Sequence, residues 1–230
     1  MDLIIFDLDG TLIDSRLDLA NAVNATRRHM GLHTLDNERV YSYVGNGAPV
    51  LIRRALGDQA GEAQVQEALE YFLEYYSDHD LDFTTLYPGV RESLDRLRDA
   101  GKQMAVLTNK PVRMTRAIVE GLGIAAHFFR VYGGNSFDLK KPDPIGVEAL
   151  MREAAVDRSR SMMVGDSSVD VLTARNARIF CCGVTYGFQP ETLADPVPDL
   201  LVNCMEELAD WVLSRSGSTT PPPPPCNLST

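Results

Sequence analysis

The segment Asp7-Leu8-Asp9-Gly10-Thr11 places two carboxylates two residues apart, directly after the apolar run Leu3–Phe6. Two such acids can reach one cavity if the chain coils as it leaves a strand, and Gly10 permits the sharp turn. The pair suits metal binding or separate roles as nucleophile and proton donor. The same residues could also form a polar turn held by Asx hydrogen bonds. A calcium loop is excluded, because its sixth and twelfth positions would be Leu12 and Asp18 instead of Gly and Glu.

The second and third polar motifs supply a hydroxyl and a positive charge. Thr108 and Asn109 follow the apolar run Met104–Leu107. A hydroxyl with backbone N–H groups at a strand-to-helix junction suits an anion, although these residues could simply cap the helix that Pro111 begins. Lys141 lies in a Lys-Lys-Pro loop, where it either directs a positive charge into a site or is solvated.

The fourth motif contains Asp166 and Asp170 and follows the apolar run Met162–Val164. Both carboxylates can face one point if a helix starts at Ser167 or Ser168, although a capping arrangement would also account for them. Singly, these later motifs are weak signals. Together they give the order acid pair, threonine, lysine, acid pair, with three of the four at the ends of expected strands.

Alternating apolar runs and helical patterns indicate how these motifs are positioned. The expected strands are Leu3–Phe6, Met104–Leu107, Phe128–Tyr132, Met162–Val164, Ile179–Val184 and Leu200–Val202, and helices are expected at Pro111–Leu122 and Pro144–Ala154. Strand and helix in alternation predict an α/β fold with a parallel sheet covered on both faces. The strands are continuously apolar, as expected when both faces are buried.

One interval, between Leu12 and about Thr85, contains no convincing strand. It has three helical patterns instead, at Arg16–Met30, Ala48–Leu56 and Glu62–Tyr76. The interval is far longer than a crossover requires, so it predicts a small helical unit of its own. Because it begins at the carboxyl end of the first strand, where ligands bind in open α/β sheets, we expect it to lie over the site as a lid.

Composition restricts the partners. The chain has 22 basic and 32 acidic residues, a formal net charge of −10. No Lys/Arg block offsets this charge, so nucleic acid and membrane surfaces are not expected partners, and an anionic substrate needs a local cation. The four cysteines form no C-x-x-C pair and no apolar stretch is long enough for a membrane span, which predicts a cytoplasmic protein. His29 and His33 lie four apart, but no third metal ligand is evident.

The four motifs, DLDGT, VLTN, KKP and GDSSVD, resemble those of the haloacid dehalogenase superfamily. The resemblance covers the chain to about Ser214. It implies a Rossmann-like, doubly wound α/β core at residues 1–15 and 86–213, with an inserted α-helical cap at 16–85. Residues 214–230 include five consecutive prolines, which cannot pack a core, so a solvated tail is expected there.

The resemblance also implies roles for the acids. Asp7 would attack phosphorus to form an aspartyl-phosphate, while Asp9 would protonate the leaving oxygen and later deprotonate the attacking water. Hydrolytic dehalogenases lack an acid at the position of Asp9, so its presence favours phosphoryl transfer. Mg²⁺ would be held by Asp7, Asp166 and the backbone carbonyl of Asp9, with Asp170 supporting this shell. The groups implied to bind the transferring phosphoryl oxygens are Thr108, Asn109 and Lys141.

The segment around Gly45, Asn46 and Gly47 is similar to that of bacterial phosphoglycolate phosphatases. This resemblance implies 2-phosphoglycolate as the substrate, with the glycine loop touching it. Arg53 is a candidate for binding the substrate carboxylate, although it could also be a surface residue of the cap. A monomer or homodimer is expected. Phosphatases of sugar phosphates, nucleotides or pyrophosphate have related caps. A β-phosphoglucomutase-like mutase is an enzymatic alternative, although such mutases tend to have Glu-Asp where this chain has Gly165-Asp166. A non-catalytic binding module is the alternative outside enzymes.

Overall fold

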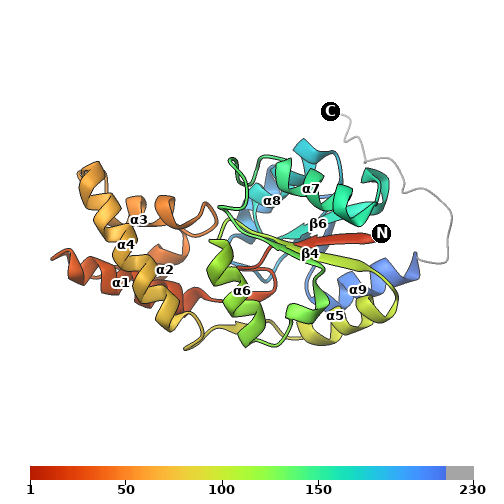
Figure 1. Ribbon diagram of the computed structural model, residues 1–230, viewed down its shortest axis with the longest axis horizontal. Coiled ribbons are helices and arrows are strands. Elements are labelled where there is room, and N and C mark those ends of the chain that lie inside the picture. The colour runs from red at the N-terminus through yellow and green to blue at the C-terminus, as the bar shows by residue number, and fades with distance from the viewer. Residues whose placement is uncertain (216–230) are drawn as a thin grey trace.

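A six-stranded parallel sheet runs through the larger part of the protein in the computed structural model, which describes residues 1–215 (Figure 1). Its strands are β1 (Leu3–Phe6), β4 (Gln103–Leu107), β5 (Arg130–Tyr132), β6 (Ser161–Gly165), β7 (Phe180–Val184) and β8 (Leu200–Val202). They lie in the order β5-β4-β1-β6-β7-β8, and every neighbouring pair is parallel. The three strands that precede the first Asp, the Thr and the second Asp motifs are thus the adjacent strands β1, β4 and β6.

Helices cover both faces of the sheet. On one face lie α5 (Val90–Asp99), α6 (Val112–Gly121) and α9 (Met205–Ser214), and on the other α7 (Ile145–Ala154) and α8 (Ser168–Ala177) (Figure 1). Along β1, Ile4 and Phe6 belong to the first apolar cluster, while Leu3 and Ile5 belong to the second. Burial of alternate residues on opposite faces explains why the strands are apolar throughout.

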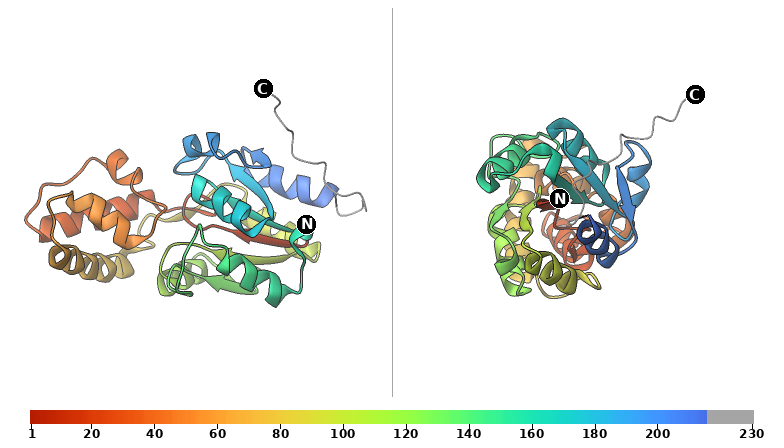
Figure 2. Two further views of the ribbon diagram at one scale, coloured as in Figure 1. Left: turned by 90° about the horizontal axis from the view of Figure 1, so that it is seen from above. Right: turned by 90° about the vertical axis from the view of Figure 1, so that its right-hand side faces the viewer.

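Four helices, α1 (Arg16–His29), α2 (Asn37–Tyr41), α3 (Ala48–Leu56) and α4 (Glu62–His79), lie at one end of the molecule beyond the sheet (Figure 2). They have an apolar cluster of their own, which includes Val23, Ile52 and Phe72. The short antiparallel strands β2 (Ile13–Asp14) and β3 (Thr85–Leu86) join this helical unit to the sheet. We refer to the unit as the cap.

The predicted fold class, a doubly wound parallel sheet with an inserted helical cap, is confirmed. The expected strand Phe128–Tyr132 begins only at Arg130, after a 3₁₀ turn at Ala125–His127. Strands β2 and β3 and the five-residue helix α2 were not predicted, because elements so short have no detectable hydrophobic period. None of the helices in residues 1–215 is long and apolar enough to cross a bilayer. The expected tail from residue 216 onward lies outside the described residues.

The two connections between cap and sheet are tied together by Asp18, a buried carboxylate in the first turn of α1. It accepts hydrogen bonds from the Phe83 amide, at 3.0 and 3.1 Å, and from the amide and hydroxyl of Thr84, at 2.8 and 2.7 Å. Thr84 immediately precedes β3, so this contact fixes the start of α1 against the return strand.

Replacing Asp18 with alanine should lower the free energy of unfolding by about 2–4 kcal/mol, because two backbone N–H groups and a hydroxyl lose their acceptor. Urea denaturation followed by circular dichroism measures this change. Asp36→Ala is the matched control. Asp36 is also in the cap and its side chain accepts a hydrogen bond from the Glu38 amide, but at an exposed position. That control should cost only about 1 kcal/mol, and equal losses in the two variants would contradict the role given to Asp18.

Candidate active site

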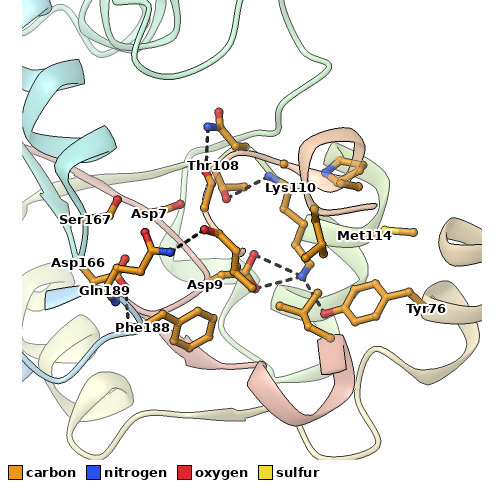
Figure 3. A pocket seen from close by; sticks show the side chains of 18 of the residues that line it. Asp7, Asp9, Tyr76, Thr108, Lys110, Met114, Asp166, Ser167, Phe188 and Gln189 are labelled. Carbon is orange, nitrogen blue, oxygen red and sulfur yellow. Dashed lines mark hydrogen bonds and ion pairs between the residues drawn. The ribbon is translucent and has the colours of Figure 1, made fainter. Parts of the chain in front are cut away.

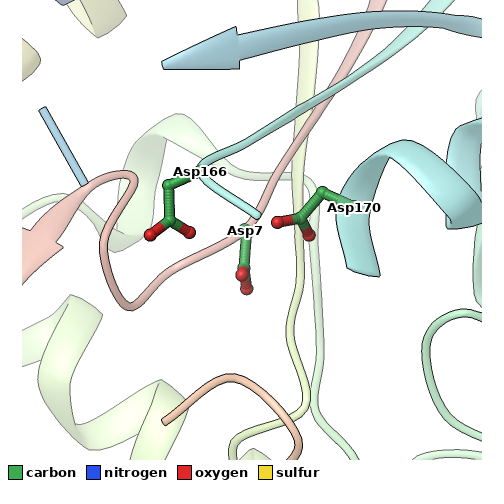
Figure 4. Close-up of side chains that lie close together, drawn as sticks. All are labelled: Asp7, Asp166 and Asp170. Carbon is green, nitrogen blue, oxygen red and sulfur yellow. The ribbon is translucent and has the colours of Figure 1, made fainter. Parts of the chain in front are cut away.

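The carboxyl ends of β1, β4 and β6 bring three of the sequence motifs together. Asp7 follows β1, Thr108 follows β4, and Asp166 follows β6. Carboxylate oxygens of Asp7, Asp166 and Asp170 all lie within 4.8 Å of one another (Figure 4). The two carboxylates of the fourth motif therefore do face the first motif, and the start of α8 at Ser168 places Asp170 in the first helical turn.

Glycines allow these carboxylates to pack so closely. At Gly10, where φ is +79°, an added Cβ would lie 2.2 Å from Asp166 Oδ2. At Gly187 it would lie 2.2 Å from Asp166 Cβ, and at Gly165 it would lie 2.1 Å from Asp170 Cγ. Gly10 is thus needed both for the turn and for the approach of Asp166. Any side chain at Gly165 would displace Asp170.

Asp170 combines the two roles that the sequence left open. Its Oδ2 accepts hydrogen bonds from the Ser167 hydroxyl (2.8 Å) and amide (3.2 Å), which caps helix α8. Its Oδ1 lies 2.6 Å from Lys141 Nζ, which is also 2.9 Å from Asp7 Oδ1. Asp170 therefore caps its own helix and orients Lys141 beside Asp7.

Burial sets the ionisation of this group. It raises the pKa of Asp7 to about 6, a shift that Lys141 opposes and Asp170 increases. Burial also raises the pKa of Asp166, and the charges of Asp170 and Asp7 raise it further. Burial by itself would lower the pKa of Lys141, but Asp170 and Asp7 outweigh it and the pKa is raised. Lys141 is therefore a permanent cation.

The residues present fit a divalent cation. Asp7, Asp166 and Asp170 offer carboxylate oxygens, the ligands that Mg²⁺ prefers. Asp7 and Asp170 share Lys141, while Asp166 accepts hydrogen bonds from the amides of Phe188 and Gln189, so three carboxylates lie beside one lysine and the group has a surplus of negative charge that a cation would neutralise. Since both oxygens of Asp170 already have partners, Asp7 and Asp166 are better placed to contact a metal directly.

Asp9 has a different environment, on the cap side of the site. Its Oδ1 accepts hydrogen bonds from the Ser15 hydroxyl (2.6 Å) and from Lys110 Nζ (3.0 Å). Lys110 Nζ also lies 2.8 Å from the hydroxyl of Tyr76, a buried residue of α4 (Figure 3). Burial would lower the pKa of Lys110, but Asp9 and Tyr76 outweigh it and the pKa is raised. The lysine is therefore charged.

The sequence patterns assigned no role to Lys110 or Tyr76. Lys110 adjoins Thr108 and Asn109 in the second motif, so its position at a strand end was an available signal. Tyr76 had none, because its sequence position at the end of an expected helix does not reveal that it reaches a lysine of the sheet domain.

The loop that precedes α3 lies against the sheet domain. Three consecutive carbonyl groups of this loop accept hydrogen bonds from side chains of the sheet domain: Val44 from Gln189 Nε2 (3.0 Å), Gly45 from Asn109 Nδ2 (3.1 Å) and Asn46 from Lys140 Nζ (2.6 Å). At Gly47, where φ is +84°, an added Cβ would lie 3.0 Å from the Asn109 carbonyl oxygen. The glycines expected to touch a ligand thus also allow the cap to close on the sheet.

A cavity of about 50 Å³ lies between cap and sheet, which is room for a few water molecules. Its lining is partly polar and partly apolar. The polar residues include Asp7, Asp9, Thr108, Asn109, Lys110, Asp166, Ser167 and Gln189, and the apolar residues include Leu19, Val44, Leu51, Phe72, Met114 and Phe188. In Figure 3, Phe188 lies beside Asp166 and Gln189, and Met114 lies beside Lys110.

Arg53 does not reach this site. Its guanidinium forms an ion pair with Glu62 at 2.7 Å, and its side chain is 51% exposed. Arg53 is not among the residues that line the cavity. The expectation that it binds a substrate carboxylate is therefore not supported. In helix α3, residues 48, 51, 52 and 55 are buried, and position 53 falls on the outer side of that stripe.

Comparison with known proteins identifies this arrangement. The model of the haloacid dehalogenase-like hydrolase family matches residues 4–184. The chain belongs to this family. The resemblance to this family that the sequence motifs indicated is confirmed, and so is the fold class of this haloacid dehalogenase-like hydrolase.

Similar proteins match this chain over most of its length. Phosphoglycolate phosphatase from Vibrio parahaemolyticus is 41% identical over 217 residues, covering 91% of this chain and 95% of the relative. The enzyme of that name from Pseudomonas fluorescens is 38% identical over 227 residues, covering 96% of this chain and 83% of the relative. Among solved structures, a predicted phosphoglycolate phosphatase from Haemophilus somnus superposes on this chain with a TM-score of 0.86 at 31% identity. The match covers 94% of this chain and 98% of that protein.

In the metal-free hydrolase, the raised pKa of Asp7 should make stability depend on pH. The folded state binds the Asp7 proton more tightly than the unfolded chain, so stability falls as pH rises from about 4 to about 6. Asp7→Asn should therefore stabilise the protein by about 1–3 kcal/mol at neutral pH in EDTA. The gain should vanish near pH 4 in thermal unfolding scans, and Mg²⁺ should stabilise the wild type more than the variant. A gain independent of pH would argue against the buried carboxylate as its cause.

Proposed function

We propose that this hydrolase is a Mg²⁺-dependent phosphatase that converts 2-phosphoglycolate to glycolate and phosphate. The observation that carries the proposal is the separation of two acids at one strand end. Asp7 adjoins Asp166 and Lys141, while Asp9 points to Ser15 and Lys110. One acid is thus placed to act as nucleophile beside a metal, and the other to transfer protons.

In the proposed reaction, an oxygen of Asp7 attacks phosphorus and the bond to the ester oxygen breaks. Asp9 gives a proton to the leaving glycolate oxygen. Water then attacks the aspartyl-phosphate, Asp9 takes the proton from that water, and phosphate leaves. Lys141 stays beside Asp7 throughout, where its charge offsets the approach of one anion to another. The Thr108 hydroxyl and the Asn109 backbone are the proposed contacts for phosphoryl oxygens.

Mg²⁺, when bound, would neutralise negative charge on the phosphoryl oxygens and on the nucleophile, a contribution that phosphoryl transfer depends on. Asp7, Asp166 and the Asp9 carbonyl are the proposed ligands, and Asp170 supports them through Ser167 and Lys141.

The substrate assignment is supported by the relatives named as phosphoglycolate phosphatases. A phosphomutase of the type that has Glu-Asp at this position is disfavoured, because a side chain at Gly165 would displace Asp170. A cytoplasmic location and a monomeric or homodimeric state are part of the proposal and rest on the sequence alone.

Phosphate release from a panel of monoesters tests the proposal. We expect release that requires Mg²⁺, disappears in EDTA and is fastest with 2-phosphoglycolate. Asp7→Asn should abolish turnover because an amide cannot act as the nucleophile, while circular dichroism shows an intact fold. Preference for another ester would keep the chemistry and remove the substrate assignment. Substantial turnover by Asp7→Asn would remove the nucleophile assignment.

Asp9→Asn should lower kcat by about 10²–10⁴-fold, the usual contribution of a general acid–base. The rate of the first turnover should fall less with 4-nitrophenyl phosphate than with 2-phosphoglycolate, because the 4-nitrophenolate leaving group needs little protonation. The burst of the first turnover, measured by stopped flow, reports this rate. Asp14→Asn is the control, because Asp14 pairs with Arg16 at the base of the cap and does not line the cavity. An equal loss of the burst with 4-nitrophenyl phosphate and with 2-phosphoglycolate would contradict proton donation by Asp9.

A further inference from the structure

The cavity has one cationic lining residue among those that the structure describes, and it is Lys110. Three of the other lining residues, Asp7, Asp9 and Asp166, are carboxylates. A substrate with a phosphate at one end and a carboxylate at the other needs a positive group at each end, because a buried carboxylate without a partner is costly. Lys141 and a metal serve the phosphate end, so the cation for the other end has to be found elsewhere.

The other candidate cations are engaged outside the cavity. Arg53 pairs with Glu62 on the exposed side of the cap, and Lys140 donates to the Asn46 carbonyl where the cap loop meets the sheet domain. Arg16 pairs with Asp14 at the base of the cap. None of these three side chains lines the cavity.

The ammonium of Lys110 has two protein partners at the cavity wall. It lies 3.0 Å from Asp9 Oδ1 and 3.4 Å from Asp9 Oδ2, and 2.8 Å from the Tyr76 hydroxyl. A lysine has three N–H donors. Because the contact with Asp9 Oδ2 is long, a stronger acceptor that enters the cavity could replace it without loss of the other two contacts.

The surroundings of Lys110 suit a carboxylate more than a neutral group. The first residues of helix α3, including Ala48, line the same cavity and add the positive end of the helix dipole. Apolar side chains such as Leu51, Phe72 and Met114 line the wall beyond, which strengthens a charge pair by excluding water.

We propose that the ammonium of Lys110 binds the carboxylate of the substrate and thereby selects 2-phosphoglycolate over alkyl phosphates that lack a carboxylate. This inference rests on the proposed function. Because Tyr76 belongs to the cap, Lys110 has all its neighbours only when the cap lies against the sheet domain. The same lysine contacts Asp9, so the carboxylate contact is made next to the acid that protonates the leaving oxygen (Figure 3).

The test compares 2-phosphoglycolate with ethyl phosphate, which has a methyl group in place of the carboxylate. In the Lys110→Met variant, kcat/KM for 2-phosphoglycolate should fall about 10- to 100-fold more than kcat/KM for ethyl phosphate, since a charge-assisted hydrogen bond is lost for one ester only. Methionine keeps a long, flexible side chain in the buried position. Lys110→Arg should retain most of the preference, because it keeps the charge.

The ratio of kcat/KM for 2-phosphoglycolate to kcat/KM for ethyl phosphate separates substrate selection from other roles of Lys110. If Lys110 acted only by orienting Asp9, kcat/KM would fall equally for both esters, and the proposal would be overturned. Arg53→Gln is the matched control and should leave the ratio unchanged. A change in the ratio with Arg53→Gln and none with Lys110→Met would return carboxylate binding to the cap surface.

A binding measurement covers the case in which Lys110→Met has no turnover. Each ester is titrated calorimetrically into the Asp7→Asn protein and into the same protein that also has Lys110→Met. The second substitution should weaken the binding of 2-phosphoglycolate at least about tenfold and leave the binding of ethyl phosphate unchanged. If the wild type does not prefer 2-phosphoglycolate, the proposed function fails and this inference fails with it. If the wild type has the preference and Lys110→Met retains it, only the role of Lys110 is lost.

Discussion

The site depends on one electrostatic constraint, which is the balance of four acidic side chains against two buried lysines. Asp7 and Asp170 share Lys141, Asp9 is paired with Lys110, and Asp166 accepts hydrogen bonds from the amides of Phe188 and Gln189. Bringing these carboxylates together costs free energy that the lysines only partly offset. The surplus of negative charge makes the group fit a divalent cation. Burial raises the pKa of Asp7 and Asp166, the neighbouring carboxylates add to both shifts, and Lys141 opposes the shift of Asp7.

The sheet makes this concentration of charge possible. In a parallel sheet all carboxyl ends lie at one edge, and the order β4-β1-β6 makes the three motif-bearing strands neighbours at the point where the strand order reverses. Glycines at positions 10, 165 and 187 then leave the space that Asp166 and Asp170 occupy. The apolar faces of the sheet are covered by helices, so a rigid core holds the charged edge in place.

The cap completes the site from the opposite side. Its loop before α3 presents three successive carbonyl groups to Gln189, Asn109 and Lys140, and its helix α4 presents Tyr76 to Lys110. The cavity between the two units is lined by carboxylates of the sheet domain and by apolar residues of the cap. Apolar neighbours strengthen the interactions between the charged groups that line the cavity.

The sequence by itself determined the fold class, the strand-end positions of Asp7, Thr108 and Asp166, and the family, because apolar periodicity and local motifs specify which segments become strands and which residues come directly after each strand. It did not determine which side chains meet across the boundary between cap and sheet. Tyr76 of the cap and Lys110 of the sheet domain are 34 residues apart. No spacing along the chain reveals such contacts, since they depend on how two separately packed units lie against each other. The position of Arg53 was not determined by the sequence for the same reason. Arg53, the candidate for the substrate carboxylate, lies outside the cavity, whereas Lys110 lines the cavity.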